Sequence, residues 1–152
     1  MHRLEPARVV VLVEGRSDRA ALEVLTSRRG VGVGVGVEVR SMGGATTVRR
    51  HLHAAVTDAA THRVLGLCDE PETDFFVRAL VASGADVATT EDLAAHGFHT
   101  CRRDLEDELI RALGPERAHR ALAEVGLAEA FERFSRQQFW AGRSSHDRRA
   151  HV

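Results

Sequence analysis

The sequence predicts an α/β fold with a mainly parallel four-stranded sheet flanked by helices, followed by further helices at the C-terminal end. Short apolar segments rich in valine alternate with longer segments whose apolar residues recur at helical spacing, which is typical of βαβ units. The first apolar segment, Val9–Val13, has four valines among five consecutive apolar residues. Such a run is expected of a strand that is buried on both faces of a parallel sheet.

The elements are predicted in order along the chain. After a first strand, Ala20, Ala21, Val24 and Leu25 share one face of a helix. In the segment 31–39, glycine and valine alternate up to Val37 before Glu38, and only the later half of the segment is predicted as strand, because glycine weakens a strand interior. The predicted strands cover about residues 8–13, the later half of 31–39, 63–68 and 97–101, and the predicted helices cover about 17–28, 46–59, 72–83, 104–113, 116–124 and 127–137.

Length and composition predict one globular domain over residues 1–140, with a polar and mobile tail over residues 141–152. No apolar run approaches the roughly 20 residues that span a bilayer. Cys68 and Cys101 are the two cysteines, and we expect reduced thiols in a cytoplasmic protein. The net charge of -1 gives no global attraction to nucleic acid. The chain has no lysine, which excludes a P-loop and any mechanism that requires lysine.

Two predicted strands end in carboxylates. Glu14 follows the first strand directly, and Asp18 comes four residues later at the start of a helix. Asp69 directly follows the strand predicted at 63–68, and either Glu70 or Glu72 is a candidate for a supporting ligand. Neighbouring strands that end in acids predict an oxygen-ligand site for Mg²⁺ or Mn²⁺ at the carboxyl edge of the sheet. The alternative is that Ser17 or Asp18 is the N-cap of the helix and that Glu14 is an exposed turn residue.

A third acid lies on the helix predicted at 104–113. At about 100° per residue, Glu106 falls within the arc of apolar residues formed by Leu105, Leu109, Ile110 and Leu113. An acid on an inward face must be paired, protonated or bound to a cation. The alternative is a favourable interaction with the N-terminal end of the helix dipole, where Asp104 is the natural N-cap.

Other motifs carry less information. The segment Gly43–Thr46 precedes a helix, so it could offer backbone N–H groups to a phosphate or could be an ordinary turn. The Gly-Val repeat never satisfies the GxGxxG spacing, so a dinucleotide fingerprint is excluded. The nine histidines include no HExxH motif, which argues against zinc as the metal.

Taken together, the segments Val11–Asp18 and Leu67–Glu72 resemble a Toprim domain, the metal-binding fold shared by topoisomerases and primases. With Asp104–Leu109 added, the chain looks most similar to the Toprim domain of OLD-family (overcoming lysogenisation defect) nucleases, in a stand-alone form without the ATPase. The resemblance covers roughly residues 9–143 and implies a Toprim-like, Rossmannoid three-layer fold.

The resemblance also implies a function and its residues. It implies a phosphodiester hydrolase, which is either a DNA nickase or endonuclease or a nucleotidyl hydrolase. The enzyme would use two Mg²⁺ or Mn²⁺ ions, and DNA is a more favoured partner than RNA. The implied metal ligands are Glu14, Asp18, Asp69, Glu72 and Glu106, and the implied catalytic residues are Glu14, Asp69 and Arg136.

The sequence departs from the family in two places. The second motif lacks its second aspartate, and Arg136 stands where OLD-type nucleases have a lysine. Arg16, Arg19, Arg49 and Arg136 are all candidates for phosphate contacts. The alternative function is a non-catalytic module that binds metal or nucleic acid and acts with a partner ATPase.

Overall fold

The computed structural model describes residues 8–31, 36–130, 132–133 and 136. The chain forms two compact units, residues 1–108 and residues 109–152, and each is described by itself. The single domain expected over residues 1–140 stays a prediction. The tail expected over residues 141–152 lies outside the described residues.

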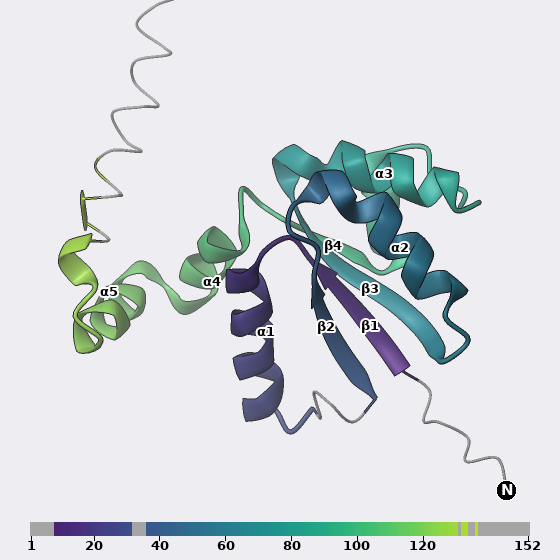
Figure 1. Cartoon of the computed structure of the whole chain (residues 1–152). Coiled ribbons are helices and arrows are strands. Elements are labelled where there is room, and N and C mark those ends of the chain that lie inside the picture. The colour runs from purple at the N-terminus through teal and green to yellow at the C-terminus, as the bar shows by residue number, and fades with distance from the viewer. Residues whose placement is uncertain (1–7, 32–35, 131, 134–135, 137–152) are drawn as a thin grey trace, which may run out of the picture. The chain divides into compact units, whose positions relative to one another are not determined.

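A parallel four-stranded sheet forms the centre of the first unit (Figure 1). Its strands are β1 (Arg8–Val13), β2 (Val37–Ser41), β3 (Thr61–Asp69) and β4 (Phe98–Cys101), in the spatial order β2-β1-β3-β4. Every neighbouring pair is parallel, and the register pairs Val13 with Ser41 and Asp69 with Cys101. The predicted four-stranded sheet is therefore confirmed, and β1 and β3 occupy its two central positions.

Three helices cover the sheet. They are α1 (Arg16–Arg28), α2 (Val48–Thr57) and α3 (Thr73–Ala82). The step from β1 to β2 and the step from β2 to β3 run in opposite directions across the sheet. Right-handed crossovers therefore place α1 and α2 on opposite faces, and α3 lies beside α2 (Figure 1). The unit has the three layers expected of an α/β fold.

Short 3₁₀ segments modify the predicted helices. One turn, Ala45–Thr47, precedes α2, and another, Glu70–Glu72, precedes α3. A longer one, Thr90–His96, was not predicted and leads into β4. It begins with a capping box between Thr89 and Asp92, because the Asp92 carboxylate accepts hydrogen bonds from the backbone N–H and the hydroxyl of Thr89.

The core lies between the sheet and the layer formed by α2 and α3. Val10 and Leu12 of β1 and Leu52 of α2 are buried there, and Phe76 of α3 packs edge-on against Phe98 with ring centroids 5.8 Å apart. The other face is covered less completely. No residue of α1 is buried, and the side chains on its predicted apolar face include Val24 and Leu25, which are 53% and 41% exposed.

The remaining helices follow β4. Helix α4 (Leu105–Leu113) begins in the first unit and ends in the second, and α5 (Pro115–Glu124) belongs to the second. The described residues from 128 to 136 are also helical, as predicted for 127–137. Within the described part of the chain, no helix is long and apolar enough to cross a membrane.

Candidate functional site

The carboxyl edge of the sheet carries a polar pocket. Glu14 follows the last residue of β1, Ser41 is the last residue of β2, and Asp69 is the last residue of β3. Because these strands are parallel neighbours, their ends meet at one edge, which is where open α/β sheets bind ligands. The pocket has a volume of about 430 Å³ and is lined by Glu14, Gly15, Arg16, Ser17, Asp18, Ser41, Gly43, Gly44, Asp69 and Glu106.

Four of the five predicted metal ligands line this pocket: Glu14, Asp18, Asp69 and Glu106. Glu72, the fifth, is not among the lining residues, although its charge acts on Glu14 and raises the pKa of that carboxyl group. Arg136 belongs to the second unit, where its guanidinium lies 3.3 Å from the Glu132 carboxylate. Its role at the site stays a prediction.

Glu14 and Asp69 are electrostatically coupled. Burial, followed by repulsion from Glu14 and Asp18, raises the pKa of Asp69 to about 7. Burial also raises the pKa of Glu14, while hydrogen bonding to the Asp69 backbone opposes that rise. One oxygen of Glu14, Oε2, is buried and has no hydrogen-bond partner among the described residues. Two such carboxyl groups hold a proton near neutral pH unless a cation neutralises them.

Asp18 has a structural role as well. Gly15 is the N-cap residue of α1, and its backbone N–H donates to Asp18 Oδ2 at 2.7 Å. The alternative from the sequence, with Ser17 or Asp18 as the N-cap and Glu14 as an exposed turn residue, is therefore wrong: Asp18 caps from the third position of the helix, and Glu14 is half-buried. The same bond holds Asp18 at the start of α1, beside the turn that follows Glu14.

The glycine-rich turn supports the backbone of the site. The backbone N–H groups of Gly43 and Gly44 both donate to the Glu14 carbonyl oxygen, at 2.9 and 3.0 Å. Both glycines have positive φ angles, 73° and 122°, which favour residues without a side chain. Both of these N–H groups are therefore used within the protein, and the turn fixes the backbone at Glu14. Phosphate binding by the rest of the segment stays a prediction.

Helix α4 brings Glu106 to the pocket. Asp104 is its N-cap as predicted, because the backbone N–H of Asp107 donates to Asp104 Oδ1 at 2.7 Å. Leu105 is buried, whereas Glu106 is exposed and lines the pocket. The helical angle predicted that the Glu106 side chain faces inward and is buried, and this prediction is wrong because the side chain is exposed. The neighbouring Asp107 and Glu108 are half-buried.

The donor set suits a hard divalent cation. It consists of carboxylate oxygens, one of them buried without a partner in the described structure, and such oxygens are the preferred ligands of Mg²⁺ and Mn²⁺. Among the described residues, no three His, Cys, Asp or Glu side chains already surround one metal position. Binding would therefore require side-chain rotation, for which the exposed Glu106 has the most freedom.

Sequence reasoning missed two lining residues, Ser17 and Ser41. Ser41 could have been found only from the end of β2, and that end was obscured by the alternation of glycine and valine before it. Arg16 was proposed as a phosphate ligand and does line the pocket. Its position follows from the turn at Gly15, which starts α1 immediately after Glu14.

The first unit is thus an α/β domain with carboxylates at the carboxyl edge of a parallel sheet. No protein-family model and no curated protein sequence matches the chain. Solved structures do match. The C-terminal region of the Burkholderia pseudomallei OLD protein aligns over 80% of this chain with a TM-score of 0.60 and 18% identity. The C-terminal region of the Xanthomonas campestris pv. campestris OLD protein aligns over 68% with a TM-score of 0.56 and 19% identity.

The match covers 66% of the Burkholderia chain and 54% of the Xanthomonas chain, so this chain spans little more than half to about two thirds of their length. At this identity the similarity concerns the fold. The chain has an OLD-like Toprim fold, which confirms the resemblance drawn from its three acidic motifs.

Proposed function

We propose that the chain is a Mg²⁺- or Mn²⁺-dependent phosphodiester hydrolase that acts on nucleic acid, DNA in preference to RNA. The observation that carries the proposal is the pocket at the carboxyl edge of the sheet. Four carboxyl groups line it, and the pKa of Asp69 is raised to about 7. A site of this kind is poised for cations, because the cations would remove the repulsion that raises that pKa.

Each side chain has a role in this proposal. Glu14 and Asp69 are the central ligands, and Asp18, Glu106 and Glu72 complete the set of carboxylates. Cations held there would supply an activated water and stabilise the leaving oxygen of an in-line displacement. Arg16 lines the same pocket, so its guanidinium can bind a phosphate oxygen of the substrate.

Two further parts of the proposal concern Arg136, which comes from the resemblance, and the location of the protein, which comes from its two cysteines. Arg136 would stabilise the anionic transition state in place of a lysine. The protein would work in the cytoplasm, with which the free state of Cys68 and Cys101 agrees.

A second function is favoured by one observation. No three side chains among the described residues are preassembled around a metal position. A non-catalytic Toprim module, acting with a partner ATPase, would need only one cation or none. A Mn²⁺ titration by calorimetry separates the two functions: two bound ions favour the hydrolase, whereas one ion favours the module.

The test of the hydrolase is cleavage of supercoiled plasmid and of single-stranded DNA in the presence of Mg²⁺ or Mn²⁺. We expect nicking by the wild type that stops in EDTA and is lost in Glu14→Ala and Asp69→Ala. Asp86→Asn is the matched control, because Asp86 is exposed and does not line the pocket.

The outcomes separate cleanly. Activity that persists equally in both site variants would assign the nicking to a contaminant or to another site. A folded wild type that fails to nick DNA with either metal would overturn the hydrolase and leave the partner-dependent module.

A further inference from the structure

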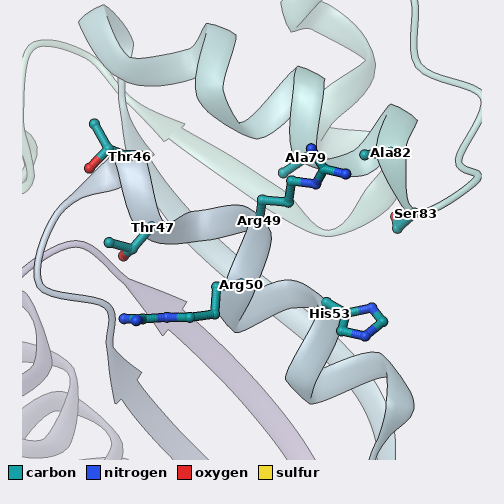
Figure 2. A pocket seen from close by; sticks show the side chains of 8 residues that line it. All are labelled: Thr46, Thr47, Arg49, Arg50, His53, Ala79, Ala82 and Ser83. Atoms are coloured by element: carbon teal, nitrogen blue, oxygen red, sulfur yellow. The ribbon is translucent and has the colours of Figure 1, made fainter.

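A second pocket lies between α2 and α3. Its volume is about 720 Å³. Arg49, Arg50 and His53 of α2 line one side, and Ser83, directly after α3, lines the other, with Thr46 at the start (Figure 2). All of these residues belong to the first unit. The proposed hydrolase leaves this pocket without a role.

The pocket is basic and its charges are not compensated. No carboxylate is among the residues that line it, and α2 contains no acidic residue. Neither Arg49 nor Arg50 forms an ion pair with any residue that the structure describes, and both are exposed. By contrast, Arg19 is paired with Glu23 at 2.7 Å on α1. Two neighbouring arginines without ion pairs in the described structure favour an anionic ligand from outside the chain.

The side chains are spread out rather than gathered. Figure 2 shows the guanidinium of Arg49 reaching toward Ala79 and Ala82 of α3, whereas that of Arg50 extends in a different direction. The hydroxyl of Ser83 already donates to the Leu80 carbonyl oxygen at 2.7 Å. Recognition therefore depends on the cationic groups. Divergent cations suit successive phosphates of a polyanion better than one isolated phosphate ion.

The basic pocket begins close to the acidic one along the chain. Gly44 lines the acidic pocket and Thr46 lines the basic pocket, and only Ala45 separates them. The 3₁₀ turn that contains Thr46 then leads directly into α2. A nucleic acid strand that enters the acidic pocket can therefore continue along the exposed side of α2.

We infer that the pocket between α2 and α3 binds backbone phosphates of a nucleic acid strand through Arg49 and Arg50, with His53 as a further donor. The inference rests on the proposed function, because it names the surface that holds the substrate beside the acidic site. It assigns no chemistry to this pocket.

The test is binding of labelled single-stranded and duplex DNA by fluorescence anisotropy, in EDTA and again with Ca²⁺, over a range of salt concentrations. We expect Arg49→Ala with Arg50→Ala to weaken binding about tenfold or more. The slope of log K against log[salt] should become shallower by about 0.7–0.9 for each phosphate that the variant no longer neutralises. The double lysine variant, Arg49→Lys with Arg50→Lys, should retain most of the affinity because it keeps both charges.

Arg28→Ala with Arg29→Ala is the matched control. These two arginines are also adjacent and exposed, at the end of α1 on the opposite side of the sheet, so the change in net charge is the same. The control should bind within about threefold of the wild type, since surface charges far from the bound phosphates act weakly. Circular dichroism of each variant checks that the fold is retained.

An equal loss of affinity in both double variants would overturn the inference, as would a wild type that binds neither DNA under either condition. Inorganic phosphate or AMP that binds as tightly as the oligonucleotide would assign the pocket to small phosphate compounds and would also overturn it. Because binding is measured without hydrolysis, a protein that binds through this pocket but never cleaves would refute only the hydrolase.

Discussion

At the scale of single residues, the proton held by Asp69 is the property that most directly links stability to the site. The pKa of this group rises from 3.8 to about 7 on folding, mainly through burial and then through the charge of Glu14. Between these two values the folded protein therefore holds a proton that the unfolded chain has released. The free energy of unfolding must fall as the pH rises through this range.

The first prediction follows from that sign. In EDTA, the free energy of unfolding should fall between about pH 4 and about pH 7 by on the order of 1 kcal/mol, after allowance for solvent screening of a half-exposed group. Asp69→Asn should largely remove this decrease. Urea denaturation at several pH values measures it, and an identical pH profile in both proteins would contradict the raised pKa.

Gly66 gives a second prediction at this scale. A Cβ atom at this position would lie 2.5 Å from Cδ1 of Phe98 and 3.2 Å from the Leu12 carbonyl oxygen. The Phe98 ring is buried against Phe76 and cannot move freely. Gly66→Ala should therefore lower the free energy of unfolding by about 1–3 kcal/mol.

The same position allows an internal control. If the clash with the ring is the cause, Phe98→Leu should cost less in the Gly66→Ala background than in the wild type, because the smaller side chain gives the methyl group room. If the two substitutions instead lower the free energy of unfolding additively in chemical denaturation, the cause lies in the backbone.

At the scale of elements, the strands were the easiest part to predict. A run of valines between polar residues leaves few alternatives to a buried strand, and β1 occupies the range 8–13 that the sequence indicates. The 3₁₀ turns before α2 and α3 could not be separated from their helices, because both kinds of helix give the same local apolar pattern. The exposure of the apolar face of α1 could not be predicted either, because periodicity shows which residues share a face but not whether another element covers that face.

The candidate site shows the same limits. Glu14 and Asp69 could be predicted because parallel strands deliver their carboxyl ends to one edge. Glu106 was predicted for the wrong reason, since its side chain reaches the pocket from an exposed position. Glu72 was expected beside Asp69, but it ends a 3₁₀ turn that the sequence did not reveal, and it does not line the pocket.

A third prediction separates the two roles of Asp18 at the start of α1. Asp18→Ala removes the acceptor of the Gly15 N–H and should cost about 1 kcal/mol of stability. Asp18→Asn keeps an acceptor oxygen but loses the charge. It should therefore restore most of the stability, measured by thermal unfolding in EDTA, while Mn²⁺ binding stays weakened. Equal stability of all three proteins would refute the capping role.

At the scale of the whole molecule, the net charge of -1 conceals a separation of charge. Four carboxylates line the pocket at the strand ends, whereas two arginines and no carboxylate line the pocket between α2 and α3. The expectation that no global field attracts nucleic acid is compatible with local attraction, because fields in salt decay over about 10 Å. The affinity for DNA should then depend strongly on salt concentration, although the isoelectric point of the protein is near neutral.

The last prediction tests whether the acidic pocket is a cation site in the intact protein. A cation that binds only the folded state raises the free energy of unfolding by RT ln(1 + [L]/Kd), about 2.7 kcal/mol at a hundredfold excess over Kd. Mn²⁺ must displace the proton that Asp69 holds up to about pH 7, so the increase in Tm should be small near pH 6 and larger near pH 8. Glu14→Gln should abolish the increase at both pH values, whereas Asp86→Asn should leave it intact. An increase that is the same at both pH values would place the cation elsewhere, and no increase in a folded wild type would rule out the metal site and the hydrolase that depends on it.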